Sequence, residues 1–332
     1  MKIPAFDAYM DMNWDEIQEL YEELLTDELK IETLTTWMTG WSDLRKLVDE
    51  RYSRLSLATA VDTTDEEAEK AYYTFIEEIY PRALAADQKL KEMLLESGLV
   101  PEGMEIILKK MRTEADLYRE ENLPLMTEER KLGTQYSKIF GAQTIEWDGK
   151  ELTLIQVNLA MLTKDRGVRK DLWERASERQ LADREAVNDL WGKFMDIRAQ
   201  LAANAGFADY RSFRWQQWLR LDYTPEDSKQ FLKAIKDVAV PAATRVYQRY
   251  IKRMGIHSLR PWDLRNNQST FHLPAIKAFE TEEEFISQVG GILNKLDPVL
   301  GGYFNTMREE KLLDLMNRKG KRTGGFCTSF AT

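Results

Sequence analysis

The stretch AVNDLWGKFMDIRAQLAANAG, residues 186–206, decides the fold class of this 332-residue chain. Its apolar side chains recur every three or four positions, at Val187, Leu190, Trp191, Phe194, Ile197 and Leu201. That spacing places them on one face of a helix. Asn204, Ala205 and Gly206 follow, and glycine is typical of the position just after a helix end. Together with the residues from Asp165 onward, the pattern predicts almost forty helical residues.

Similar patterns lie on both sides of this stretch. Residues 14–56 carry two helical stretches, and a helix is expected from residues 62–67 to Gly98, with a kink at Pro81. Further helix starts are predicted at Pro101, at Thr127, at residues 224–227 and at residues 281–284. The helix from 224 is expected to reach Gly255 with Pro241 inside it. These lengths favour long antiparallel helices.

Two short segments break the helical pattern. In GAQTIEWDGKELTL, residues 141–154, the dipeptide Asp148-Gly149 separates two strand-like runs and predicts a small β-hairpin near 143–154. A glycine-rich basic turn leads into the aromatic run FCTSF, which predicts a β-strand near 324–330. The expected fold class is therefore all-α with these two β segments. The hairpin also suggests a boundary between an N-terminal helical domain, 1–141, and a second domain, 142–332.

Composition limits the classes of function. Only 17 glycines and 9 prolines accompany 43% hydrophobic and 31% charged residues, which favours long helices. The net charge of −9 argues against a nucleic-acid partner. The sequence shows neither a signal peptide nor a membrane span, so no membrane partner is expected. The single cysteine, Cys327, fits a reducing compartment, and a cytoplasmic location is predicted.

The residues that commonly carry catalysis form no complete site. His257 and His272 are fifteen residues apart, without the spacing of a zinc-binding helix, and predict no metal site. Cys327 could be a nucleophile activated by nearby basic residues or a small packed hydrophobe. The basic cluster Arg318, Lys319, Lys321 and Arg322 fits either an anion contact or a solvated turn; it does not match a phosphate loop.

Several segments, in order, resemble one known family. They are WDGKELTL, TKDRGVRKDLW, NAGFADYRSF, RLDYTPEDSKQFLKAIKDVAVP, LRPWDL and LDLMNRKGKRTGGFCTSF, which together extend over roughly residues 140–332. The chain thus resembles the oligoendopeptidase F branch of the thimet oligopeptidase family of zinc metallopeptidases. The first 140 residues resemble it only in being helical. The resemblance implies a nearly all-helical enzyme with a deep channel that admits unfolded oligopeptides.

The resemblance also implies a zinc site of a defined kind. Such enzymes bind zinc through His-Glu-x-x-His on one helix and a later Glu, and the Glu of the motif takes a proton from the zinc-bound water. This chain contains none of these ligands and is expected to stop before that helix. No catalytic or metal residue is therefore assigned, and zinc is expected in the full-length protein only. Gly324, Gly325, Phe326, Cys327 and Thr328 are predicted to bind substrate by strand addition, with a purely structural turn as the alternative.

The resulting functional prediction is the N-terminal part of a zinc-dependent oligoendopeptidase that hydrolyses short unfolded peptides. The chain would supply channel wall and substrate cleft, would be inactive alone, and would expose apolar helix faces that favour self-association. An alternative is a catalytically inactive helical scaffold that binds peptides or a partner polypeptide. A third hypothesis is an enzyme that depends on Cys327.

Overall fold

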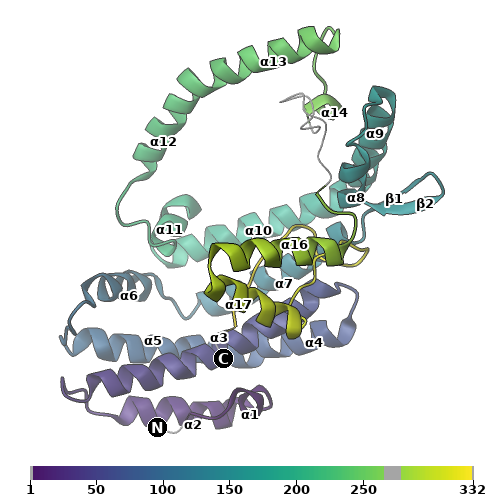
Figure 1. The fold of residues 1–332 in the computed structure, drawn as a ribbon. Helices are drawn as coiled ribbons and strands as arrows, with labels where there is room; N and C mark the ends of the chain where they lie inside the picture. Colours follow the sequence, from purple (N-terminus) through teal and green to yellow (C-terminus); the bar gives the residue numbers. More distant parts are fainter. Residues whose placement is uncertain (1–2, 265–277, 331–332) are drawn as a thin grey trace. The chain divides into compact units, whose positions relative to one another are not determined.

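The computed structural model describes residues 3–264 and 278–330. Throughout these ranges the regular structure is helical, apart from one two-stranded antiparallel sheet (Figure 1). The prediction of an all-α fold with a small hairpin is confirmed. His272 lies outside the described residues. None of the helices described is both long enough and apolar enough to cross a membrane.

The chain forms two compact units, neither of them continuous in sequence. Unit 1 comprises Met1–Phe140, Glu185–Ala234 and Arg322–Thr332, and unit 2 comprises Gly141–Arg184 and Ile235–Lys321. The junction at Phe140 and Gly141 lies beside the predicted boundary. Residues 185–234, however, belong with the N-terminal helices. The division into domains 1–141 and 142–332 stays a prediction.

Unit 1 is entirely helical in its regular structure. Its helices are α1 Phe6–Met10, α2 Trp14–Thr26, α3 Leu34–Val61, α4 Glu66–Thr74, η1 Phe75–Ile79, α5 Tyr80–Glu96, α6 Glu105–Leu117, α7 Asn122–Gly141, α10 Arg184–Asn204, α11 Tyr210–Gln217 and α12 Pro225–Ala234. Helix α7 begins at Asn122, five residues before the predicted start at Thr127. Pro124 lies within its first turn, where the backbone N–H that proline lacks has no helical partner.

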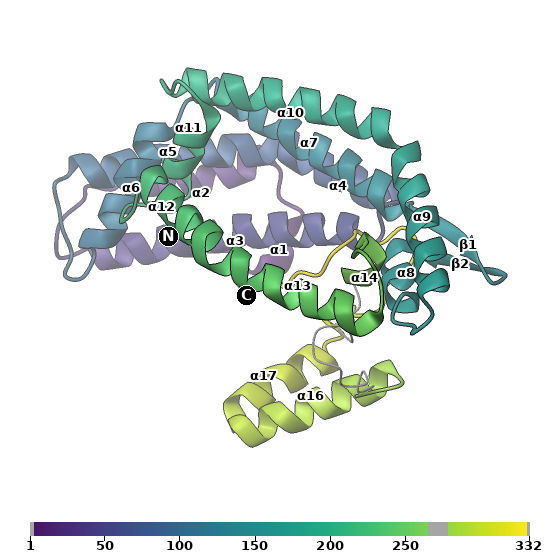
Figure 2. The same ribbon diagram turned by 90° about the horizontal axis from the view of Figure 1, so that it is seen from above.

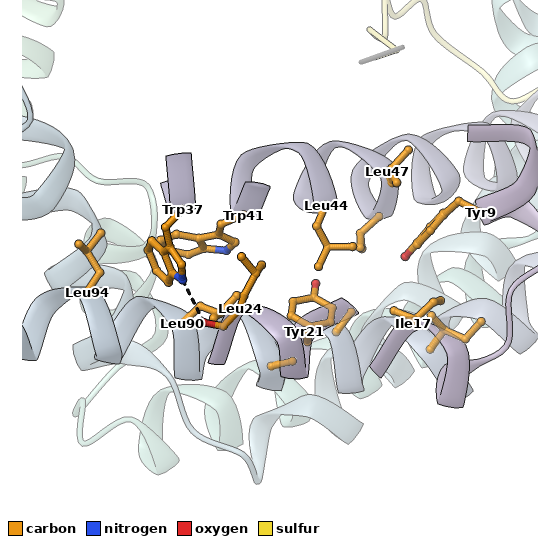
Figure 3. Packing of buried hydrophobic residues seen from close by; sticks show 14 of the residues in the cluster. Tyr9, Ile17, Tyr21, Leu24, Trp37, Trp41, Leu44, Leu47, Leu90 and Leu94 are labelled. Carbon is orange, nitrogen blue, oxygen red and sulfur yellow. Dashed lines mark hydrogen bonds between the residues drawn. The ribbon is translucent and has the colours of Figure 1, made fainter. Parts of the chain in front are cut away.

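The larger of two apolar clusters in unit 1 lies among α2, α3 and α5 (Figure 3). Ile17, Leu44 and Leu90 are completely buried there. The indole N–H of Trp37 donates a hydrogen bond of 3.0 Å to the Leu24 carbonyl, so a buried donor is satisfied. The apolar face of α10 packs in a second cluster of unit 1, so the amphipathic faces read from the sequence meet in more than one apolar cluster.

Both prolines expected inside long helices follow a π-helical turn. Residues Phe75–Ile79 form η1 ahead of Pro81, and residues Ile235–Ala239 form η2 ahead of Pro241. Proline has no N–H and its ring collides with the carbonyl four residues earlier, so an α-helical hydrogen bond cannot form there. The wider turn lets the helix continue, and each proline lies at the start of the next α-helix, in α5 and in α13.

Unit 2 contains the hairpin and the remaining helices of the described part of the chain. They are β1 Thr144–Trp147, β2 Lys150–Thr153, α8 Leu154–Ala160, α9 Arg166–Ala182, η2 Ile235–Ala239, α13 Val240–Met254, α14 Pro261–Leu264, α16 Glu282–Leu296 and α17 Pro298–Glu309. Strand β1 pairs antiparallel with β2 in the register Thr144 to Thr153. Asp148 and Gly149 have φ angles of 50° and 72°, the positive values that this tight turn requires.

Helices α16 and α17 lie side by side (Figure 2). Gly301 permits their close approach, because a Cβ at this position would lie 2.1 Å from Oδ1 of Asn294. Any larger residue would require at least the Asn294 side chain to move.

Two sequence-based predictions are corrected. The continuous helix expected from Asp165 is interrupted at Asp183, where α9 ends and α10 begins. The Asp183 carboxylate accepts hydrogen bonds from Arg179 and Gln143. The β-strand predicted near 324–330 is wrong, since these residues have no regular secondary structure. A strand needs an adjacent strand to bond with, and in the described part of the chain β1 and β2 pair only with each other.

Candidate functional site

The C-terminal segment 322–330 belongs to unit 1 and lies against α3. The backbone N–H of Arg322 donates a 2.9 Å hydrogen bond to the Ala60 carbonyl. Further along, the Arg54 guanidinium lies 4.3 Å from the centre of the Phe330 ring. The segment is thus attached near both ends without forming a strand.

The five residues predicted to bind substrate lie between these attachments. Gly324 has a φ of +94°, which side chains other than glycine's rarely tolerate. Phe326 is half exposed, with the Arg322 guanidinium 4.2 Å from its ring centre, and Cys327 is an exposed free thiol. Among the described residues, 323–330 make no backbone–backbone hydrogen bonds. Their main-chain groups therefore remain open to another backbone, except that the Thr328 carbonyl lies 3.9 Å from Sγ of Cys327.

Three residues of the basic cluster are engaged in ion pairs within unit 2. Arg318 and Lys321 contact Asp314 at 2.8 and 3.0 Å, and Lys319 contacts Glu151 of β2 at 2.7 Å. The hydrogen bond from Arg318 holds the pKa of Asp314 below its usual value. The cluster therefore anchors the loop before Gly324 and attaches it to the hairpin.

A buried carboxylate joins two of the segments that carry the family resemblance. Asp263 of α14 accepts two hydrogen bonds of 2.9 Å from Arg166 of α9, and Arg169 lies 3.4 Å from the same carboxylate. Arg169 also donates to the carbonyls of Thr163 and Trp262. The segments TKDRGVRKDLW and LRPWDL thus form one packed junction within unit 2.

The environment of Asp263 keeps the carboxylate charged. Burial acts to raise its pKa, but hydrogen bonds from Arg166 and from the Arg260 backbone N–H outweigh this effect and leave the pKa below its usual value. The neighbouring indoles of Trp173 and Trp262 lie 5.4 Å apart, centre to centre. Tryptophan emission can therefore report on the packing of this junction.

The described residues do not fit a zinc site. No group of three or more His, Cys, Asp or Glu side chains within 3–264 and 278–330 could hold a metal ion. His257 is exposed between α13 and α14, and Cys327 lies in the C-terminal segment. Since zinc sites need three or four such ligands around one point, no catalytic step is assigned here to a metal held by these residues.

Unit 1 also contains a cavity of about 540 Å³ that the sequence did not indicate. Its walls come from α3, α5, α6, α7, α10 and α11 and from the turn before α7. Asp209 caps α11 by accepting a 2.8 Å hydrogen bond from the Ser212 N–H, and this start places Tyr210, Phe213 and Arg214 in the wall. The segment NAGFADYRSF therefore has a structural role that its sequence alone did not reveal.

Charged side chains organise one side of this cavity. Asp87 accepts a 2.7 Å hydrogen bond from the Trp41 indole, and Lys91 pairs with Glu114 at 2.8 Å. Burial acts to lower the pKa of Arg45, but Asp87 and other carboxylates outweigh this and raise it. These contacts join α3, α5 and α6. Trp41 and Asp87 are 46 positions apart in the chain and Lys91 and Glu114 are 23 apart, so no spacing within one helix indicates these contacts.

Comparison with known families agrees with this architecture. The model of peptidase family M3 matches residues 159–332, more than half of the chain, and the model of the peptidase M3 N-terminal domain matches residues 7–120. The chain therefore belongs to peptidase family M3. No curated protein matches its sequence.

Solved structures show the same fold. A protein from Bacillus anthracis strain Ames, described as an oligoendopeptidase F, has a TM-score of 0.88 and 22% identity over 96% of this chain and 59% of its own. A second oligoendopeptidase F has a TM-score of 0.89 and 20% identity, covering 96% of this chain and 57% of its own. PZ peptidase A, solved with an inhibitor, has a TM-score of 0.88 and 21% identity, covering 97% of this chain and 59% of its own. The chain spans about three fifths of the length of these proteins.

The Asp263 junction makes a testable prediction about stability. Replacing the carboxylate in Asp263→Asn is expected to destabilise the protein by about 3 kcal/mol at pH 7, because the buried Arg169 then lacks its anionic partner. The measurement is urea unfolding followed by tryptophan emission. Asp171→Asn, which removes an exposed ion pair with Arg175 on the same helix, is expected to leave the midpoint nearly unchanged.

The pH dependence has a defined sign. The pKa of Asp263 is lower in the folded protein than in the unfolded chain, where it is about 3.9. The contribution of Asp263 to the free energy of unfolding is therefore fully present above this pH. It is lost as the pH falls through the folded-state pKa, so wild type and Asp263→Asn should converge only in acid. An equal difference between the two proteins at pH 7 and pH 2 would contradict this assignment.

Proposed function

We propose that this chain supplies channel wall and substrate cleft to a zinc-dependent oligoendopeptidase that hydrolyses short unfolded peptides. The match of the family M3 models to residues 7–120 and 159–332 carries the proposal. In this proposal the zinc is bound outside the described residues, since these offer no ligand cluster. When bound, zinc would activate the water that attacks the peptide bond.

The role proposed for this chain's own residues is to bind the substrate main chain. The free backbone groups of 323–330 support strand addition by a peptide at Gly324, Gly325, Phe326, Cys327 and Thr328. Main-chain recognition requires no particular side chain on the peptide, which suits a peptidase of broad specificity. Peptides are the partners proposed, rather than nucleic acids or membranes, because the net charge is −9. The cytoplasm is the location proposed.

The first test is metal content and hydrolysis. The purified 332-residue chain is expected to contain no stoichiometric zinc after dialysis and to leave fluorogenic oligopeptides intact, because no described ligand cluster can bind the ion tightly. Elemental analysis and a peptide-cleavage assay measure both. One tight zinc per chain, with cleavage that a chelator abolishes, would overturn the view that the metal lies elsewhere.

The second test concerns the main chain at Cys327. Cys327→Pro removes a backbone N–H, so it is expected to weaken the binding of a labelled unstructured nonapeptide roughly three- to tenfold. Fluorescence anisotropy measures the affinity. Cys327→Ala is the matched control, because it removes the exposed thiol and keeps the N–H. Equal affinity of both variants and the wild type would exclude strand addition here, and loss in both would point to the side chain.

A third proposal concerns self-association. Large apolar side chains are exposed within unit 2 along η2 and the start of α13, namely Ile235, Val238 and Val240. Such a surface favours contact with a second protein surface, and we propose a second copy of this chain. Val238 is 71% exposed, so Val238→Ser should leave the fold intact and weaken association.

Sedimentation velocity at several concentrations measures this association. Val100→Ser is the control, because Val100 is similarly exposed, at 56%, but lies between α5 and α6. A wild-type protein that stays monomeric at all concentrations would refute self-association through this surface.

A further inference from the structure

We infer that the cavity of unit 1 binds a small organic anion, in which a carboxylate is joined to an apolar group. This inference does not rest on the proposed peptidase activity, because every lining residue belongs to unit 1 and the test measures binding only.

The charges of the lining favour an anion. Five cationic side chains, Arg45, Lys91, Arg119, Arg130 and Arg214, face three carboxylates, Asp87, Glu114 and Glu129. The whole chain has the opposite balance, with a net charge of −9. A local surplus of positive charge on an acidic protein attracts anions to this cavity in particular.

The carboxylates of the lining are already neutralised. Lys91 lies 2.8 Å from Glu114 and 3.9 Å from Asp87, and the Arg198 guanidinium lies 2.8 Å from Glu129. A ligand cation would have to compete with these protein cations. The lining therefore offers little to a positively charged ligand.

Three guanidinium groups remain without such a partner. Within the described part of the chain, Arg119, Arg130 and Arg214 form no ion pair with a carboxylate. Arg119 donates to backbone carbonyls, Arg130 donates to the Met126 carbonyl and lies 4.9 Å from the Tyr80 ring centre, and Arg214 contacts Gln217. Each guanidinium has five N–H donors, so donors remain for a carboxylate, which arginine binds with two parallel hydrogen bonds.

The rest of the lining suits an apolar group. Leu84, Leu117, Leu123, Met126, Leu201 and Phe213 contribute side chains from several elements. The volume of about 540 Å³ lies within the range of about 300–1,000 Å³ that is usual for small-molecule sites. A branched aliphatic acid or the C-terminal residue of a peptide combines the required carboxylate and apolar group.

The test is titration calorimetry of the 332-residue chain with N-acetyl-leucine. N-acetyl-leucinamide has the same shape without the charge and is expected not to bind. Arg119→Gln and Arg214→Gln are each expected to weaken N-acetyl-leucine binding about tenfold, as loss of a charge-assisted bidentate contact should. The matched controls, Arg112→Gln on α6 and Arg211→Gln on α11, change exposed arginines outside the lining and should bind like the wild type.

The outcomes separate the alternatives. Absence of binding, equal binding of the acid and the amide, or equal affinity of the lining and control variants would each overturn the inference. Circular dichroism verifies that each variant is folded. The two lining variants change different positions, so if one of them fails to fold, the other still tests the inference. A further titration with 4-methylpentanoate distinguishes the source of the carboxylate: weaker binding than N-acetyl-leucine points to a peptide end, and equal binding points to a simple carboxylic acid.

Discussion

Two buried charges, Asp87 and Lys91, and the partly exposed Glu114 form a chain of ionic contacts that joins helices of unit 1. Asp87 accepts from the Trp41 indole at 2.7 Å, and Lys91 lies 2.8 Å from Glu114. A buried charge without a partner destabilises a fold by several kcal/mol. Helices α3, α5 and α6 are therefore held where Asp87 meets Trp41 and Lys91 meets Glu114. The same arrangement forms one wall of the cavity and neutralises its carboxylates.

Unit 2 shows the same constraint in a different form. The carboxylate of Asp263 is fully buried and takes its partners from α9, while the hairpin is attached to the loop at 317–321 through Glu151 and Lys319. These contacts join residues that lie 94, 97 and 168 positions apart in the chain. The sequence segments that carry the family resemblance therefore meet in two places within unit 2, at Asp263 and at the contact of Lys319 with the hairpin.

The C-terminal segment differs from both, because its attachments are few and its backbone groups remain open. An aromatic, β-prone run such as FCTSF has the composition of a strand, but a strand forms only where another edge supplies hydrogen bonds. In the described residues β1 and β2 pair only with each other, and the segment pairs with neither. The wrong strand prediction and the proposal of peptide binding at 324–328 have this one physical origin.

The sequence by itself determined the helical class, the hairpin and most helix starts. These depend on neighbours within a few positions: the apolar spacing of residues 187–201, the turn at Asp148-Gly149 and the caps at Thr281 and Asp65. It also supported the family resemblance, since the segments that carry it are contiguous in the chain. Only the tertiary structure decided the composition of the two units, the burial of Asp263 and the cavity with its lining of arginines. Those features join residues far apart in the chain, and such pairings follow from how helices pack rather than from the spacing within any one helix.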